Sequence, residues 1–215
     1  MIQRLPFGHP VTAVDVARLE SILREAFVAL RFHRPGSLAV LNLACGRADE
    51  TGALAAALAP MEIARYLGLD LRDGTIEEAR KRWALPGGQI EFRAGDGSAI
   101  HRLEQMPAWD LIFIRHQNFY HDPSRWDRLF GNALSALAPS GLLVCTSYFD
   151  REHELMKASL RTRGASLLWD VCPPGSRPLF DAPGKSVDRR LAFFCNSCER
   201  LDDNPIAARE CIPTE

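Results

Sequence analysis

The sequence predicts an α/β fold that is doubly wound: a mainly parallel seven-stranded sheet with helices on both faces. Short apolar segments typical of strands alternate along the chain with longer segments typical of helices. The first predicted strand, 38–44, is almost wholly apolar, as expected of a parallel strand covered on both faces. The chain has 215 residues, of which 47% are hydrophobic, which is enough for the core of one domain.

The predicted elements follow one another in a regular order. The first is an amphipathic helix near the N-terminus, where Thr12 and Asp15 have the spacing of a capping box and apolar residues then recur at helical intervals. A break at 34–37 ends it. Strands are predicted at 38–44, 64–70, 90–95, 110–116, 141–148, 166–171 and 189–195, and further helices at 49–59, 74–84, 98–104, 124–138 and 151–163.

This order divides the chain into three parts. Residues 1–36 form an N-terminal helix or cap, and residues 37–197 form one ligand-binding domain. Residues 198–215 are polar and have no periodic pattern, so we expect a frayed tail.

Charge and cysteine content narrow the possible partners and compartment. Lys and Arg total 26 against 27 for Asp and Glu, so no general attraction to nucleic acid or to a membrane is expected. We find no apolar run of signal-peptide or membrane-span length and expect a cytoplasmic protein with reduced cysteines. Cys195 and Cys198 have the spacing of a zinc half-site, but no second pair accompanies them, so we predict no metal.

Polar residues follow the first four predicted strands, where ligands bind in such sheets. The turn at 44–50 has one glycine, Gly46, and ends in Asp49 and Glu50, which would repel a pyrophosphate. Two interpretations of these carboxylates remain open: they favour a cationic or zwitterionic ligand, or they only cap the following helix. The four strand-end segments are 42–49, 70–73, 96–98 and 115–121.

Three of these segments together resemble a known family. "VLNLACGRAD" at 40–49, "YLGLD" at 66–70 and "FRAGDGSAI" at 92–100 are similar to class I S-adenosylmethionine-dependent methyltransferases, and the likeness extends from about Leu38 to Cys195. In that family the first turn typically reads V-L-D-x-G-C-G-x-G. The resemblance implies a Rossmann-like S-adenosylmethionine-binding domain and methyl transfer. The cofactor carries a sulfonium and an ammonium but no phosphate, so nearby carboxylates would favour it.

The resemblance also implies roles for particular residues. The turn around Gly46 would lie against the methionine moiety, Asp70 would accept hydrogen bonds from the ribose, and Asp96 or its loop would contact the adenine. This sequence departs from the family pattern at Asn42, Ala44 and Ala48; the methyl of Ala44 can be accommodated if its backbone keeps a negative φ and the ligand lies to one side. The residues assigned to cofactor binding are Asn42, Ala44, Cys45, Gly46, Asp70, Leu71, Asp96, Gly97 and Arg115.

The segment 114–126 is the predicted site of chemistry. Methyl transfer is an in-line displacement, and a hydroxyl acceptor must also lose its proton. His116 is our candidate for the base and Tyr120 for a substrate contact, although both residues also suit an ordinary surface loop. The long segment 172–190 is either a lid with basic residues for an acidic substrate or a solvated loop.

The acceptor is expected to be a small molecule. The segment after the fourth strand lacks the paired prolines typical of amide methylation, and no broad basic patch points to nucleic acid. Two alternatives remain: a catalytically silent domain that binds the cofactor or a regulatory partner, and an NAD-dependent oxidoreductase, which the missing glycines disfavour. Acceptor atom and oligomeric state stay open.

Overall fold

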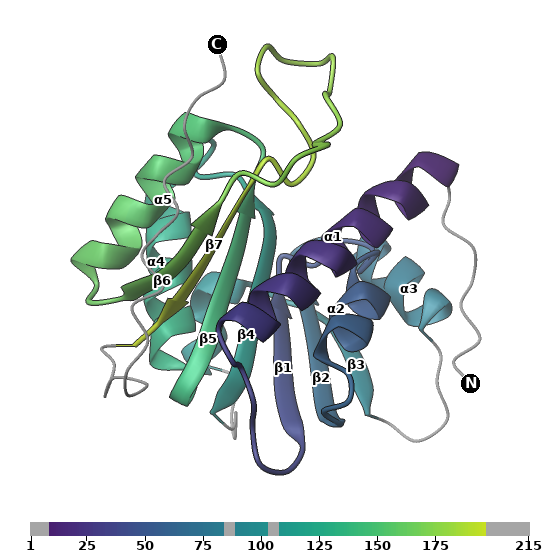
Figure 1. Ribbon diagram of the computed structural model, residues 1–215, viewed down its shortest axis with the longest axis vertical. Helices are drawn as coiled ribbons and strands as arrows, with labels where there is room; N and C mark the ends of the chain where they lie inside the picture. The colour runs from purple at the N-terminus through teal and green to yellow at the C-terminus, as the bar shows by residue number, and fades with distance from the viewer. Residues whose placement is uncertain (1–8, 84–88, 103–107, 197–215) are drawn as a thin grey trace. The chain divides into compact units, whose positions relative to one another are not determined.

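The computed structural model describes residues 9–83, 89–102 and 108–196, which form two compact units that meet in sequence at Gly97 and Ser98 (Figure 1). Each unit is described by itself. The predicted tail at 198–215 lies outside the described residues.

The first unit is built on three parallel strands. β2 pairs in parallel with β1 on one side and with β3 on the other, which gives the order β3-β2-β1. Helix α1 contacts α2, while α3 contacts β2 and β3 (Figure 1). The elements are α1 (Pro10–Ala29), β1 (Leu38–Leu43), α2 (Thr51–Leu58), β2 (Ile63–Asp70), α3 (Asp73–Arg82) and β3 (Ile90–Ala94).

The start of α1 differs from the prediction. The helix begins at Pro10, and the side chain of His9, rather than Thr12, is the cap: its Nδ1 accepts a hydrogen bond from the backbone N–H of Val11 at 3.2 Å. Proline suits the first helical position because its fixed φ is already helical and its missing N–H would have no partner there. The apolar face of α1 is buried as the periodicity predicts.

The second unit combines parallel and antiparallel pairing. β4 and β5 are parallel, β7 pairs antiparallel with β5, and β6 pairs antiparallel with β7, which gives the order β4-β5-β7-β6. The segment 172–189 connects β6 to β7 and projects beyond the strands (Figure 1). After the 3-10 helix η1 (Gly97–Arg102), the elements are β4 (Trp109–Gln117), α4 (Pro123–Ser135), β5 (Leu137–Ser147), α5 (Asp150–Thr162), β6 (Ser166–Val171) and β7 (Arg190–Cys195).

Strand β5 begins at Leu137, four residues before the predicted start at Gly141. Leu137 is paired with Trp109, whose backbone N–H donates to the carbonyl of Ala136 at 2.8 Å. Proline and glycine at 139 and 141 are typical strand breakers, and Ser140 has a left-handed φ of 56°. The chain nevertheless runs so close here that a Cβ on Gly141 would lie 2.8 Å from the Trp109 carbonyl oxygen.

The alternation of strands and helices therefore confirms the predicted α/β class, a mainly parallel seven-stranded sheet with one antiparallel hairpin at its edge. In the described part of the chain, no helix has the length and hydropathy needed to cross a membrane. Cys45, Cys145 and Cys172 are free thiols as expected, but Cys195 is disulfide-bonded, so the expectation of reduced cysteines is wrong for that residue.

Candidate active site

The turn between β1 and α2 has three residues in the left-handed region. Ala44, Gly46 and Ala48 have φ values of 55°, 53° and 55°. These are the three positions at which the sequence pattern places glycine, so the backbone has the glycine conformation even where the residue is alanine. The negative φ that would accommodate the Ala44 methyl is therefore not observed. A left-handed alanine costs about 1 to 2 kcal/mol, because its Cβ approaches the following carbonyl oxygen.

Asp70, at the end of β2, holds this turn in place. Its Oδ2 accepts a hydrogen bond from the backbone N–H of Gly46 at 2.8 Å, and its Oδ1 accepts one from the backbone N–H of Arg72 at 3.0 Å. The side chain is only 5% exposed. Burial opposes its ionisation, but the hydrogen bonds from Arg72 and Gly46 outweigh burial and lower the pKa of Asp70. The carboxylate therefore stays charged at neutral pH.

Arg72 also binds Asp70 through its guanidinium group. Nε lies 3.0 Å from Oδ1 and Nη2 lies 3.3 Å from Oδ2. The same Nη2 would lie 3.3 Å from a Cβ on Gly46, so the guanidinium lies over the turn. Because the Arg72 side chain is 68% exposed, it can leave Asp70 without breaking the core. Leu71, between them, is 52% exposed.

A buried polar cluster lies beneath the turn. The amide Nδ2 of Asn42 donates to Glu50 Oε1 at 2.5 Å and to the Tyr66 hydroxyl at 2.9 Å, and this hydroxyl lies 2.9 Å from Thr51 Oγ1. All four residues are at most 3% exposed. Burial, with the nearby charge of Glu50, raises the pKa of Tyr66, which therefore stays a phenol. In the described part of the chain, Asn42 Oδ1 is buried without a hydrogen-bond partner.

The two carboxylates of the turn have separate partners. Glu50 occupies the N-cap position of α2, yet its side chain makes no capping hydrogen bond and instead accepts from Asn42. Asp49 forms an ion pair with Arg82 of α3. The Glu50 side chain therefore binds Asn42 rather than capping the helix.

Three other residues assigned to the cofactor lie nearby in the chain. The Cys45 backbone N–H donates to the Leu69 carbonyl at 3.0 Å, and burial raises the pKa of its thiol, which makes it a poor nucleophile. Asp96 and Gly97 follow β3, where Gly95 donates to the Asp70 carbonyl at 2.9 Å. The ends of β2 and β3 are thus joined on the side of the unit that carries Asp70.

In the second unit, Arg115 and His116 meet Asp188. Arg115 Nε and Nη2 lie 3.1 and 2.6 Å from the two carboxylate oxygens of Asp188, and His116 Nε2 lies 2.9 Å from Oδ1. Asp188 is fully buried. Burial opposes its ionisation, but the charges of Arg115 and His116 outweigh burial and hold the pKa of Asp188 well below its usual range.

Aromatic and polar groups fix the position of His116. Its ring stacks on Tyr148, with centroids 4.0 Å apart, and its backbone N–H donates to Thr146 Oγ1 at 2.9 Å. Lys185 lies over the Tyr148 ring at 4.8 Å. Burial raises the pKa of Tyr148 to about 12, so Tyr148 is a phenol at neutral pH. His116 is thus part of an ordered cluster rather than a mobile surface loop.

Tyr120 lies apart from these contacts and close to Glu152. It is 46% exposed and its ring meets the edge of Phe149 at 6.3 Å. Glu152, in the first turn of α5, is only 1% exposed, and its Oε2 has no hydrogen-bond partner in the described part of the chain. Burial raises the pKa of Glu152 to about 7, although the backbone N–H groups of Tyr120, Phe119 and Tyr148 oppose this shift.

A serine, a histidine and an aspartate are also aligned in this unit. Ser147 Oγ lies 3.1 Å from His153 Nδ1, and His153 Nε2 lies 3.0 Å from Asp170 Oδ1. Ser147 and His153 are fully buried, so no substrate can reach the hydroxyl. Gln117 donates to the same Ser147 hydroxyl at 2.9 Å. The set therefore connects β4, β5, α5 and β6 and is not a hydrolytic triad.

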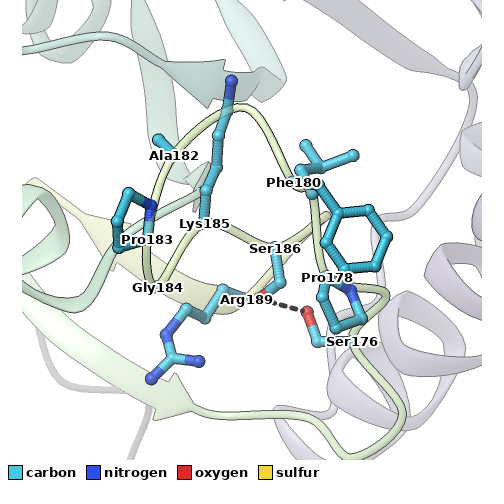
Figure 2. Close-up of a pocket in the computed structure, with 10 residues that line it drawn as sticks. Ser176, Pro178, Phe180, Ala182, Pro183, Gly184, Lys185, Ser186 and Arg189 are labelled. Carbon is cyan, nitrogen blue, oxygen red and sulfur yellow. Dashed lines mark hydrogen bonds between the residues drawn. The ribbon is translucent and has the colours of Figure 1, made fainter.

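Residues of the segment 172–189 line an open pocket of about 460 Å³ (Figure 2). Ser176 donates to Ser186 at 3.1 Å across its base, and Pro178 is bridged to Ser186. Phe180, on its rim, is fully exposed. Lys185 and Arg189 also line the pocket, but they form ion pairs with Asp181 and Asp150. This segment is therefore ordered at its base.

Sequence reasoning missed Asp188, Tyr148 and Glu152. Each lies outside the segment after β4 in which we looked for chemistry, and Asp188 is 73 positions from Arg115. Of the residues predicted there, the structure brings Arg115 and His116 to one carboxylate. No cluster of three potential metal ligands occurs among the described residues.

Comparison with known proteins tests the resemblance to methyltransferases. Residues 40–141 match the sequence family described as "Methyltransferase domain". This segment is similar to methyltransferase domains. The match agrees with the resemblance to methyltransferases, and the matched segment contains the turn at 44–50, Asp70, Asp96, Arg115 and His116. No curated protein matches the sequence.

Solved structures share the fold. An S-adenosylmethionine-dependent methyltransferase from Clostridium acetobutylicum superposes with a TM-score of 0.65 and 12% identity over 85% of this chain and 92% of that one. The PH0226 protein from Pyrococcus horikoshii superposes with a TM-score of 0.66 and 14% identity over 88% of this chain and 92% of that one. The [4+2]-cyclase SpnF superposes with a TM-score of 0.55 and 19% identity over 72% of this chain and 59% of that one. The chain thus shares a Rossmann-like fold with an S-adenosylmethionine-dependent methyltransferase.

The first unit fits S-adenosylmethionine chemically. The turn at 44–48 has glycine-like backbone at all three pattern positions, and Asp70 provides an ionised carboxylate beside an exposed strand end. Asn42 Oδ1 is a buried acceptor beneath the turn whose hydrogen-bonding capacity is unused in the described part of the chain. An anionic carboxylate and an amide oxygen suit a cofactor that carries positive charge and hydroxyl donors.

Proposed function

We propose that the protein is an S-adenosylmethionine-dependent methyltransferase whose acceptor is a small molecule. The observation that carries the proposal is the left-handed backbone at Ala44, Gly46 and Ala48, anchored on Asp70 by the Gly46 N–H within the segment that matches the family. Alanine adopts this conformation only at a cost, so a turn that retains it twice is held by the surrounding structure.

The residues of the first unit would bind the cofactor. Asp70 would accept hydrogen bonds from the ribose hydroxyls once the Arg72 guanidinium moves away, and the turn around Gly46 would face the methionine moiety. Leu71 offers an exposed apolar side chain beside Asp70, and Asp96 with Gly97 offers polar backbone at the next strand end. When bound, the cofactor supplies an electrophilic methyl group on a sulfonium.

The residues of the second unit would serve the acceptor. Catalysis by these enzymes needs the nucleophile aligned and, for a hydroxyl, its proton removed. His116 would take that proton, and the exposed Tyr120 would contact the acceptor. The net charge of −1 supports a small acceptor over a nucleic acid, because phosphate-backbone binding depends on many cationic contacts.

Thermal unfolding with S-adenosylhomocysteine, and separately with NADH, tests the cofactor. At a hundredfold excess over its dissociation constant, a ligand of the native state stabilises by about 2.7 kcal/mol, so Tm should rise with S-adenosylhomocysteine only. The Asp70→Ala variant should lose this rise. Glu77→Ala removes an exposed carboxylate on α3 and should keep it. A rise with NADH alone would replace the proposal with an oxidoreductase.

The interaction of Arg72 with Asp70 favours a second candidate, a cofactor-binding domain without turnover. Both oxygens of Asp70 already accept hydrogen bonds, and one partner is the Arg72 side chain. Under this alternative the chain binds S-adenosylhomocysteine but transfers no label from S-adenosylmethionine to a panel of small hydroxyl, amine and thiol acceptors. Label transfer to any of them would exclude a silent domain.

A further inference from the structure

Two segments that are far apart in the sequence meet at the carboxylate of Asp188. Asp188, at the end of the segment 172–189, lies between Arg115 and His116 at the end of β4. Arg115 binds it with two nitrogens, at 3.1 and 2.6 Å, in the fork geometry that makes such pairs directional. Asp188 has no exposed surface, so this geometry is enclosed by protein.

The backbone is strained at both ends of the contact. His116 has φ 57° and Asp188 has φ 46°, in the left-handed region that residues other than glycine rarely adopt. Such strain persists only where neighbouring contacts hold it, and it concentrates at functional sites. Here the His116 N–H donates to Thr146 and the Asp188 carboxylate binds two side chains.

The contact determines which ring nitrogen carries the proton. Nε2 of His116 lies 2.9 Å from Oδ1 of Asp188 and 3.2 Å from the Asp188 backbone N–H. The carboxylate requires Nε2 to be a hydrogen-bond donor, whereas the backbone N–H requires it to be an acceptor. The ionised carboxylate is closer and is the stronger partner, so Nε2 carries the hydrogen and donates it. In the neutral ring, Nδ1 is then the basic nitrogen.

We propose that Asp188 is a positioning residue that fixes His116 in the Nε2–H tautomer, so that Nδ1 is the general base for an acceptor hydroxyl. This inference rests on the proposed methyl transfer. As the acceptor oxygen bonds to the methyl carbon, the carbon–sulfur electron pair returns to sulfur and the hydroxyl proton passes to Nδ1. Solvent then removes the proton from the imidazolium. Arg115 acts through Asp188 by keeping it charged.

The charged and titratable groups around His116 come from four elements. Arg115 lies on β4, Asp188 at the base of the segment 172–189, and Tyr148 just after β5, with Lys185 over its ring. Glu152 of α5 lies next to the Tyr148 backbone. Among these, Asp188 is the anion in direct contact with the ring, so its removal should change the titration of His116 most.

Nitrogen-15 NMR of the histidine rings tests the inference without an acceptor. The probe is uniformly 15N-histidine-labelled full-length protein, with the His116 signals assigned from their loss in His116→Gln. In the wild type we expect the neutral His116 ring to show the Nε2–H tautomer. In Asp188→Asn we expect a mixture of tautomers and a titration midpoint lower by about one to three pH units, because a contacting negative charge is lost.

Asp181→Asn is the matched control. Asp181 lies in the same segment, is exposed, and pairs with Lys185 rather than with His116. It should leave both readouts unchanged. An Nδ1–H tautomer in the wild type would overturn the inference, as would an unchanged midpoint in a folded Asp188→Asn protein. If that variant does not fold, the wild-type tautomer decides.

The two proposals can fail separately. If the tautomer and the shift are found but S-adenosylhomocysteine does not raise Tm, Asp188 still positions His116 and the methyl-transfer proposal is wrong. If S-adenosylhomocysteine binds but His116 has the other tautomer, the methyltransferase proposal remains and the role of Asp188 is wrong.

Discussion

At the scale of single residues, two alanines adopt the backbone of glycine. Ala44 and Ala48 both lie in the left-handed region, but they differ in burial: Ala48 is fully buried, whereas Ala44 is partly exposed. Glycine at position 44 would remove the strain of the Cβ and lose little apolar contact. At position 48 the same change would also remove a buried methyl group and leave a small cavity.

Ala44→Gly should therefore stabilise the protein by about 1 kcal/mol, because relief of the left-handed strain exceeds the added entropy of the unfolded chain. Urea unfolding measures the difference. The control is Ala56→Gly within α2, where glycine should cost about 1 kcal/mol. A loss of stability in both variants would show that the turn does not hold Ala44 at positive φ.

Glu152 is the second residue whose environment has a measurable consequence. Its pKa is raised from 4.5 to about 7 by burial, so the folded state retains a proton that the unfolded state has released. The free energy that protonated Glu152 contributes to folding is fully present below about pH 4.5. It is lost as the pH rises to about 7.

Glu152→Gln removes this titration. Relative to the wild type, the unfolding free energy of the variant should rise by about 3 kcal/mol between pH 4 and pH 8, the direction expected for a raised carboxyl pKa. Urea unfolding at both pH values gives the difference. An advantage that is equal at the two pH values would mean that Glu152 ionises normally in the folded protein.

At the scale of elements, the carboxylate beside Asn42 of β1 comes from Glu50, the residue just before α2. The family pattern places an acid at position 42, and the sequence alone showed only that Asn42 lacks it. In the structure Glu50 supplies the carboxylate, and the Asn42 amide binds it at 2.5 Å. Sequence spacing could not show this pairing, because it depends on how the turn folds back over the strand.

Asn42→Asp would place a second buried carboxylate against Glu50. We expect a loss of about 3 kcal/mol at pH 8, as for a buried charge without compensation, and a smaller loss at pH 4, where one carboxyl can be protonated. The exchanged pair Asn42→Asp with Glu50→Gln should recover most of the stability. If Asn42→Asp alone is neutral at pH 8, the two side chains are not in contact.

The elements themselves were largely predictable. Alternation of apolar and helical segments located the strands of both units, because buried parallel strands are apolar and amphipathic helices have a clear period. Errors occurred where local signals conflict with tertiary structure. The start of β5 was hidden by Pro139 and Gly141, and the cap of α1 was assigned to Thr12 instead of His9.

At the scale of the whole molecule, the candidate site was predictable only as far as motifs extend. The resemblance led to Gly46, Asp70 and His116 because each lies at or just after the end of a strand in the family order. Asp188 could not be found this way, since its contact with Arg115 forms only when a segment 73 positions away folds onto β4. Single-sequence patterns report local order, whereas this site depends on long-range contacts.

The segment 172–189 combines a buried base with an exposed rim. Asp188 at the base is fully buried, while Phe180 is fully exposed. Changes in the length or composition of the segment near Phe180 would therefore leave the contact between Asp188 and His116 intact. The segment can therefore take insertions or substitutions around Phe180 without losing the buried contact between Asp188 and the His116 ring.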